Sequence, residues 1–194
     1  MTTHARTVRS SPLALTVLAL LMHEPQHAYG LQRLIRQWGK DLVVNVGQRT
    51  SLYRTIERLA NAGLVAVRGT RRDHAYPEKT VYEITGSGRA VAREWLAEML
   101  AEPKQEFPQF PAALSHLLML PPAEAAALLR QRLDTLTAQT TDLEAKLTAQ
   151  REAGLDRVGL VELEYLHAVT RAEVTWLRGV VDDLDAGLLT WRSA

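Results

Sequence analysis

The chain has 194 residues, 46% of them hydrophobic and 23% charged, which excludes a largely disordered protein and allows one large or two small domains with packed cores. It contains no cysteine, which excludes disulfide bonds, a thiolate nucleophile and a cysteine-ligated zinc ion, and suits a cytoplasmic protein. The formal net charge is only +1, because a basic first half (residues 1–102, 14 Lys/Arg against 9 Asp/Glu) is offset by an acidic second half (residues 103–194, 9 against 13).

The beginning of the sequence predicts two helices separated by a turn. Residues 13–22 are almost wholly apolar, which predicts a helix buried on most sides. Two arginines before this run give it the outline of a secretory signal, but it is shorter than the about 20 residues that span a bilayer, so we predict a core helix and no membrane partner. The second helix is expected over about residues 27–38, with an apolar face formed by Tyr29, Leu31, Leu34, Ile35 and Trp38.

A third helix is predicted in the stretch TSLYRTIERLANAGLV, residues 50–65. Thr50 or Ser51 offers the hydroxyl group of an N-cap, and Gly63 stands where a helix ends with a left-handed residue. The buried stripe of this helix would consist of Leu52, Ile56 and Leu59. Its opposite side is polar, so the helix presents a charged face to water or to a partner.

After this helix the hydrophobic pattern changes its period. The segments LVAVRGT, residues 64–70, and KTVYEIT, residues 79–85, predict the two strands of a hairpin, joined by the polar and basic loop RRDHAYPE. Thr85 is expected to cap a fourth helix over residues 87–100. The proline-rich segment EPKQEFPQFP, residues 102–111, is the expected boundary between two domains.

The second half predicts a short helix over residues 113–120 and two long helices, the first over about residues 123–153. Both long helices carry the apolar seam of a coiled coil. The seam residues are Leu129, Leu133, Leu136, Leu143 and Leu147 in the first, and Val174, Leu177, Val181, Leu184 and Leu188 in the second. The seams can pack on each other or on a second copy of the chain. Acidic helical domains of this kind most often serve dimerisation, so we predict a homodimer.

Three helices followed by a two-stranded hairpin are the element order of a winged helix-turn-helix. We therefore predict a mainly α fold, with an N-terminal winged helix-turn-helix DNA-binding domain (three helices plus a two-stranded wing) over residues 1–102 and a C-terminal helical dimerisation or effector domain over residues 103–194. The major groove admits one helix, and bidentate arginine on guanine is its commonest specific contact. Double-stranded DNA is the expected partner. The alternative is a protein-protein interaction module that uses the winged helix and the long helices without binding DNA.

The predicted DNA contacts lie on the third helix, just before it, and in the wing. Arg54 and Arg58 are one turn apart on the polar side, and Glu57 either accepts a hydrogen bond from cytosine or holds one arginine in place. The hydroxyl group of Tyr53 donates to a phosphate, or its ring simply packs. The complete set is Gln48, Arg49, Thr50, Ser51, Tyr53, Arg54, Arg58, Arg71, Arg72 and Lys79. Without a partner, the same side would be an ordinary solvated helix face.

Three stretches resemble the PadR family of transcriptional regulators: SPLALTVLALLMHEPQHAYGLQRLI, TSLYRTIERLANAGLV and KTVYEITGSGR. The resemblance covers about residues 11–100, and the long second half is similar to the subgroup that adds a helical dimerisation domain. It implies a homodimer that binds an inverted repeat, usually represses transcription, and is released by a small molecule or a stress signal. By position, Tyr53 falls on the recognition-helix tyrosine of the family, whereas Ala28, Gly30 and the tip of the wing depart from its pattern.

No catalytic residue, metal ligand or cofactor is predicted. His23 and His27 flank a proline, so they do not share a helix face, and there is no H-E-x-x-H motif. No glycine-rich phosphate loop or nucleophile elbow is present, so no enzyme is expected. Flat aromatic walls suit planar ligands, which makes Trp95 and Trp176 candidates for binding a small hydrophobic or aromatic effector, although packing in a core or an interface explains them as well.

Overall fold

The computed structural model of the chain describes residues 8–46, 49–73 and 76–192. The chain forms two compact units, the first ending at Gln105 and the second beginning at Glu106. Within the described ranges, no helix combines the length and the apolar character needed to cross a membrane.

The elements of the first unit are, in chain order, α1 (Pro12–His23), β1 (Gln26–His27), α2 (Ala28–Gln37), the short 3-10 helix η1 (Lys40–Leu42), α3 (Arg49–Asn61), β2 (Val65–Asp73), β3 (Tyr76–Ile84) and α4 (Gly86–Ala101). Local chemistry explains several of these bounds. The hydroxyl group of Thr85 caps α4 as predicted, accepting from the Gly88 amide at 3.0 Å. Gly63, with φ of +72°, ends α3 in the predicted left-handed conformation.

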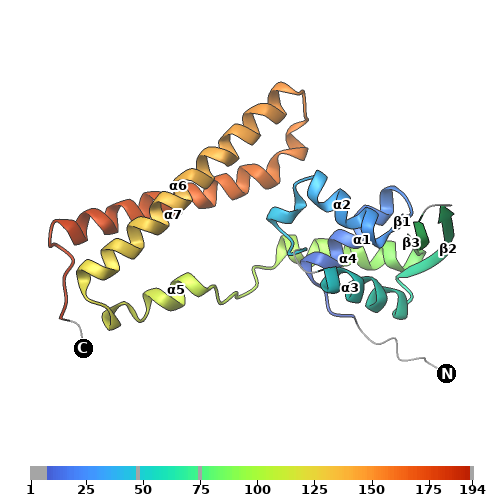
Figure 1. Ribbon diagram of the computed structural model, residues 1–194, viewed down its shortest axis with the longest axis horizontal. Coiled ribbons are helices and arrows are strands. Elements are labelled where there is room, and N and C mark those ends of the chain that lie inside the picture. Colours follow the sequence, from blue (N-terminus) through green and yellow to red (C-terminus); the bar gives the residue numbers. More distant parts are fainter. Residues whose placement is uncertain (1–7, 47–48, 74–75, 193–194) are drawn as a thin grey trace. The chain divides into compact units, whose positions relative to one another are not determined.

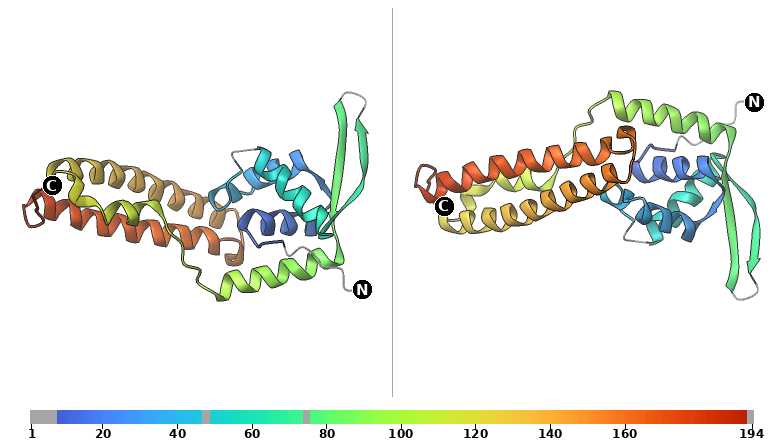
Figure 2. Two further views of the ribbon diagram at one scale, coloured as in Figure 1. Left: turned by 90° about the horizontal axis from the view of Figure 1, so that it is seen from below. Right: turned by 90° about the horizontal axis from the view of Figure 1, so that it is seen from above.

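The sheet of the first unit has three antiparallel strands in the order β1-β3-β2. The sequence predicted only the hairpin of β2 and β3, because β1 consists of two residues and is too short to show a periodic pattern. In β1, Gln26 pairs with Tyr82 and His27 with Val81. Figure 2 shows that the β2–β3 hairpin extends well beyond the helices of its unit.

The hairpin is longer than predicted, because most of the expected loop RRDHAYPE belongs to the strands. β2 continues to Asp73 and β3 begins at Tyr76, with register irregularities after Val67 and after Arg71. Pro77 cannot donate a hydrogen bond to a sheet ladder, which disfavours it inside a strand. The described strand pairs join this part of β3 to β2 alone, so the proline lies at an edge where it is tolerated.

The core of the first unit is built around α1, whose Val17 and Leu18 are fully buried. α1 packs against α2, α3 and α4, and Figure 2 shows it between α3 and α4. Leu31 and Ile35 of α2 are also fully buried. The apolar run at the start of the sequence therefore forms a central core helix, as predicted.

Tyr29 and Trp38, predicted on the apolar face of α2, are instead exposed. Tyr29 is two residues from the buried Leu31, and residues at that spacing point to opposite sides of a helix. Trp38 lies beyond the end of α2, where its ring meets the ring of His23 edge-on at 5.5 Å. The buried face of α2 is therefore narrower than the sequence pattern indicated.

The elements of the second unit are α5 (Gln109–Leu114), the 3-10 helix η2 (Leu117–Met119), α6 (Pro122–Glu152), the 3-10 helix η3 (Arg157–Gly159) and α7 (Val161–Asp185). The long helix predicted over about residues 123–153 is confirmed. The short helix predicted over residues 113–120 is wrong, because α5 begins earlier, inside the proline-rich segment. Pro111 lies in the first turn of α5, where the missing amide costs no helical hydrogen bond.

α6 and α7 run antiparallel and pack against each other (Figure 1). Both predicted seams meet in this contact. Its buried residues include Leu129, Leu143 and Leu147 of α6 and Val174, Leu177 and Val181 of α7. Leu188 is an exception: it lies beyond the end of α7, after Gly187 has turned the chain with φ of +70°, and is 78% exposed.

Candidate nucleic-acid interface

α3 is held in its unit by a buried stripe and by the loop that precedes it. Leu52, Ile56 and Leu59 are at most 1% exposed, which confirms the predicted stripe. Val46, in the preceding loop, is also buried, and its carbonyl group accepts a hydrogen bond from Nε2 of Gln32 at 3.5 Å. The polar side of α3 is therefore fixed on a rigid part of the unit.

The first turn of α3 differs from the prediction. The helix begins at Arg49, so Thr50 and Ser51 already lie inside it and do not occupy the N-cap position expected for them. Thr50 is exposed and Ser51 is half-buried. Gln48, another predicted contact, lies outside the described residues.

The polar side of α3 forms one exposed row at the four-three-four spacing of a helix face. The row consists of Thr50, Arg54, Glu57 and Asn61. Tyr53 and Arg58 flank the row on its two sides, and both are exposed. This arrangement brings six polar or aromatic side chains to one accessible surface.

The charged side chains of this surface do not pair with one another. No ion pair joins Glu57 to Arg54 or Arg58 in the part of the chain that the structure describes. The interpretation in which Glu57 merely holds an arginine in place therefore gains no support. All three groups are free to contact a partner.

Every member of the row except Thr50 borders a depression of about 570 Å³ that joins two distant parts of the sequence. Its lining residues are Val8, Arg9, Arg54, Glu57, Arg58, Asn61 and Ala62. Arg9 was not predicted as a site residue. Its place just before the apolar run of α1 was visible in the sequence, but no local pattern indicates that this segment lies against α3.

The predicted wing contacts lie on both strands of the hairpin. Arg71 of β2 and Lys79 of β3 are partners in the strand register, so their backbones lie opposite each other. Arg72 follows Arg71 at a register irregularity of the same strand. Nearer the base, Arg68 forms an exposed cross-strand ion pair with Glu83 at 3.8 Å. Three basic residues are thus collected toward the far end of the hairpin.

The start of α2 presents two side chains for which no sequence pattern predicted a role in the interface. Nδ1 of His27 caps the helix by accepting from the Gly30 amide at 2.7 Å. Tyr29 is exposed, and its ring lies 6.2 Å from that of His27. A Cβ atom at position 30 would meet the His27 ring at 3.1 Å and the end of the Gln26 side chain, so a larger residue here would press on the cap and Gln26 would have to move. The amides of a helix N-terminus and a nearby hydroxyl group suit a phosphate.

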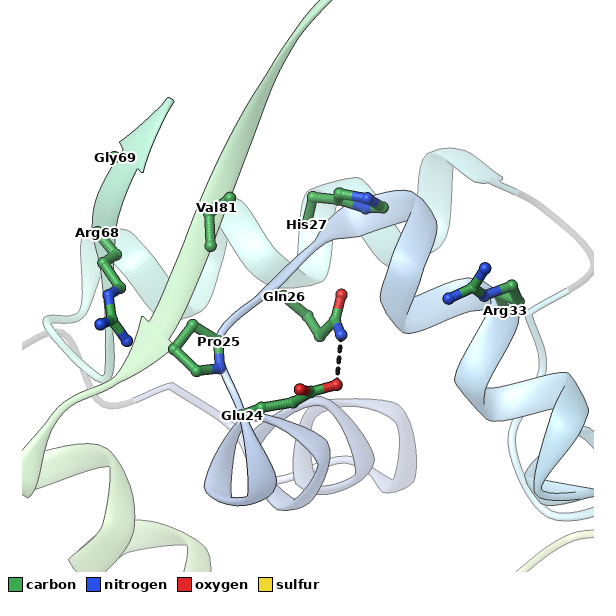
Figure 3. A pocket seen from close by; sticks show the side chains of 8 residues that line it. All are labelled: Glu24, Pro25, Gln26, His27, Arg33, Arg68, Gly69 and Val81. Atoms are coloured by element: carbon green, nitrogen blue, oxygen red, sulfur yellow. Dashed lines mark hydrogen bonds between the residues drawn. The ribbon is translucent and has the colours of Figure 1, made fainter. Parts of the chain in front are cut away.

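A second depression, of about 590 Å³, lies between the start of α2 and the base of the wing (Figure 3). Arg33 of α2 and Arg68 of β2 border it on opposite sides. Between them, the carboxylate of Glu24 accepts a hydrogen bond from Nε2 of Gln26 at 2.7 Å. A carboxylate thus partly offsets the basic groups, and no lining residue is shared with the depression beside α3.

The two tryptophans proposed to bind an effector have different environments. Trp95 of α4 is 7% exposed and belongs to the core of the first unit, which agrees with the packing alternative considered for it. Trp176 of α7 is about half exposed, and its ring contacts that of Phe110 edge-on at 6.3 Å. The guanidinium group of Arg132 lies 3.7 Å over the other ring of this pair, that of Phe110. Only Trp176 keeps an accessible aromatic surface.

Glu164 of α7 is held by two arginines. It accepts hydrogen bonds from Arg151 of α6 at 3.1 Å and from Arg157 of η3 at 3.3 Å. The hydrogen bond from Arg151, assisted by the charge and hydrogen bond of Arg157 and opposed by desolvation, lowers the pKa of Glu164 below its ordinary value. The cluster connects the end of α6 to the start of α7.

Comparison with known proteins connects the first unit to a family. A family model described as the transcriptional regulator PadR-like family matches residues 17–94, from α1 into α4. No curated protein sequence matches the chain.

Several solved structures share the fold over most of the chain. Bacillus subtilis PadR in complex with operator DNA has a TM-score of 0.73 at 18% identity, covering 90% of this chain and 99% of that one. Bacillus subtilis PadR in complex with p-coumaric acid has a TM-score of 0.69 at 18% identity, with the same coverage. The Vibrio cholerae virulence activator AphA has a TM-score of 0.68 at 19% identity, covering 90% of this chain and 98% of that one. At these identities the likeness establishes the fold.

Proposed function

We propose that the chain is a PadR-like transcriptional regulator, as the family model matching residues 17–94 supports, and that it binds double-stranded operator DNA as a homodimer and represses transcription. α3 would enter the major groove, and the wing would contact the backbone or the adjacent minor groove. We place the protein in the cytoplasm and assign it no enzymatic activity and no cofactor.

The observation that carries this proposal is the row of unpaired charged groups on α3. Arg54 can bind guanine in a bidentate manner, and Glu57 can accept a hydrogen bond from the amino group of cytosine. Arg58, on the flank of the row, can reach a neighbouring base or a phosphate. Because no ion pair joins these three groups, binding DNA would break no such pair among them.

Contacts to phosphates would fix the register of α3 in the groove. The exposed hydroxyl groups of Tyr53 and Thr50 are suited to this role, as is the start of α2 with Tyr29. In the wing, the paired strand positions of Arg71 and Lys79 would direct two basic residues to the same stretch of backbone. The remaining contacts in the proposal are Gln48, Arg49, Ser51 and Arg72.

The homodimer is supported by the face of α7 that points away from α6. Leu177 and Val181 occupy the seam with α6, whereas the opposite face carries an exposed apolar stripe at helical spacing. The stripe consists of Val161, Tyr165, Val169, Ala172 and Trp176. Since the seam is already filled within the chain, we infer that a second copy covers this stripe. A two-fold dimer would read an inverted repeat with half-sites about 10 to 10.5 base pairs apart, or a multiple of that spacing.

The sign of regulation and the signal rest on the family resemblance. Repression is the expected outcome, although the same fold serves the virulence activator AphA. We infer that a small hydrophobic or aromatic effector releases the DNA, with Trp176 as the candidate contact. A reporter gene measures the sign, and quenching of tryptophan fluorescence together with a change in DNA affinity identifies an effector.

Fluorescence anisotropy with the full-length protein tests DNA binding. One labelled duplex carries the region upstream of the gene, because regulators of this kind often bind their own promoters, and a second of equal length is unrelated. We expect tighter binding to the first, and weaker binding to both as salt rises. Binding that is absent, or that does not respond to salt, would overturn the proposal.

Light scattering tests the dimer separately. The wild-type protein is expected to have the mass of two chains. Val169→Arg, which places a charge in the apolar stripe, is expected to shift the protein toward one chain, whereas Gln139→Arg on the exposed surface of α6 serves as the matched control. A wild-type protein with the mass of one chain would contradict the homodimer.

A further inference from the structure

The segment that precedes α1 is fixed at two points. Val8 packs against the core of the first unit. The hydroxyl group of Ser11 caps α1, accepting from the Ala14 amide at 3.2 Å. Arg9 lies between these two contacts and is exposed. Its backbone position is therefore fixed, while its side chain is accessible to a partner.

That place is the flank of α3. Arg9 lines the same depression as Arg54, Glu57 and Arg58. None of the three arginines forms an ion pair in the described part of the chain. Three guanidinium groups and one carboxylate therefore surround one hollow, which leaves it with an excess of positive charge.

This charge arrangement suits a phosphate group. Unpaired guanidinium groups around one hollow repel each other, and an anion that enters it offsets this cost. A guanidinium group matches the oxygen geometry of a phosphate and binds it through two hydrogen bonds. In the proposed complex the row of α3 would face the bases, whereas Arg9 lies beside the helix, where the DNA backbone at the edge of the groove would run.

We propose that Arg9 binds a phosphate of the DNA backbone at the edge of the major groove that α3 occupies. The segment before α1 is then a third DNA-contacting element beside α3 and the wing. This inference rests on the proposed function. It adds a contact that strengthens binding to every sequence and carries no base preference of its own.

The test compares full-length wild-type protein with Arg9→Ala by anisotropy, on the upstream duplex and on the unrelated duplex, between about 50 and 200 mM salt. We expect Arg9→Ala to weaken binding to both duplexes equally, by roughly three- to tenfold at the lower salt, and to reduce the slope of log affinity against log salt by about 0.9. Arg9→Lys keeps the charge but not the bidentate geometry, so it should retain most of the slope with a smaller loss of affinity.

Arg93→Ala is the matched control, since Arg93 is an exposed arginine of α4. The helix α4 lies on the other side of α1 from α3 (Figure 2). Thermal unfolding of Arg9→Ala should match that of the wild type, because Arg9 is exposed. The inference would be refuted, and the proposed function left intact, by one result: wild-type DNA affinity falls with salt, but Arg9→Ala changes that affinity and its salt slope no more than Arg93→Ala does. A loss confined to the upstream duplex would indicate a base contact and overturn the phosphate assignment. A wild type that binds neither duplex would refute both.

Discussion

The carbonyl group of Leu64 occupies the space that a side chain on Gly88 would need. A Cβ atom built at position 88 would meet the carbonyl oxygen of Leu64 and would lie 2.8 Å from Cγ1 of Ile84. The same oxygen accepts a hydrogen bond from the Thr85 amide at 3.1 Å, so the backbone cannot simply move away. The first turn of α4 therefore packs directly on Leu64, the last residue before β2.

We predict that Gly88→Ala destabilises the first unit by roughly 1 to 3 kcal/mol, because the added methyl group forces the start of α4 away from Leu64. Thermal unfolding followed by circular dichroism measures the change. Gly86→Ala is the control, since a Cβ atom there has no neighbour within 4 Å. Equal stability of the two variants would contradict the close contact.

Arg54→Ala is expected to weaken binding to a specific operator by roughly 1 to 3 kcal/mol and to relax the preference for one base pair, because a bidentate base contact is lost. Arg71→Ala, in the wing, should instead weaken binding to all sequences alike and lower the salt slope by about 1. Competition binding with a set of single-base operator variants distinguishes the two. Identical effects of both substitutions on every sequence would argue against base reading by Arg54.

Tyr53→Phe separates the two roles considered for this tyrosine. The ring is about half exposed, so removal of the hydroxyl group should leave unfolding unchanged. If the hydroxyl group donates to a phosphate, the affinity for DNA falls by roughly 0.5 to 1.5 kcal/mol, the usual net value of a hydrogen bond. An unchanged affinity in the anisotropy assay would leave packing as its role.

Glu164→Gln is expected to change how the stability of the second unit depends on pH. The pKa of Glu164 is lowered in the folded chain, chiefly by the hydrogen bond from Arg151, so the carboxylate stabilises the fold above its unfolded pKa of about 4.5. This contribution is lost as the pH falls through the lower folded value. In urea unfolding, the Glu164→Gln variant should therefore have a lower free energy of unfolding than the wild type at neutral pH, and this difference should disappear in acid. Glu144→Gln, on the exposed side of α6, should show no such trend.

Most of the helices, though not α5, could be predicted because burial imposes a period on the sequence. Leu52, Ile56 and Leu59 recur at helical spacing, and so do the leucines of α6, since each of these sets covers one side of a cylinder. Capping residues indicated where helices begin or end, and the clearest case is Thr85 at the start of α4. These signals are local, so a single sequence contains them.

The features that the sequence did not predict depend on contacts between distant residues. β1 exists only because Gln26 and His27 meet the end of β3, and the extended wing depends on pairing across a hairpin that includes a proline. The apolar seams of the two long helices could have packed on each other or on a second copy of the chain. Only the fold shows that the seams of α6 and α7 pack on each other within one chain. Arg9 reaches the flank of α3 because Val8 packs against the core, and the spacing of residues in the sequence does not predict this contact.

The hydrogen bond from the Gly30 amide to Nδ1 of His27 also selects one tautomer of this histidine. A ring nitrogen that accepts a hydrogen bond carries no proton, so the neutral imidazole holds its hydrogen on Nε2 and offers it as a donor at the start of α2. Asparagine places an oxygen where Nδ1 lies and could replace the cap, whereas glutamine, one carbon longer, could not. His27 therefore ends one strand, begins one helix and presents an N–H group of fixed identity, all from a single side chain.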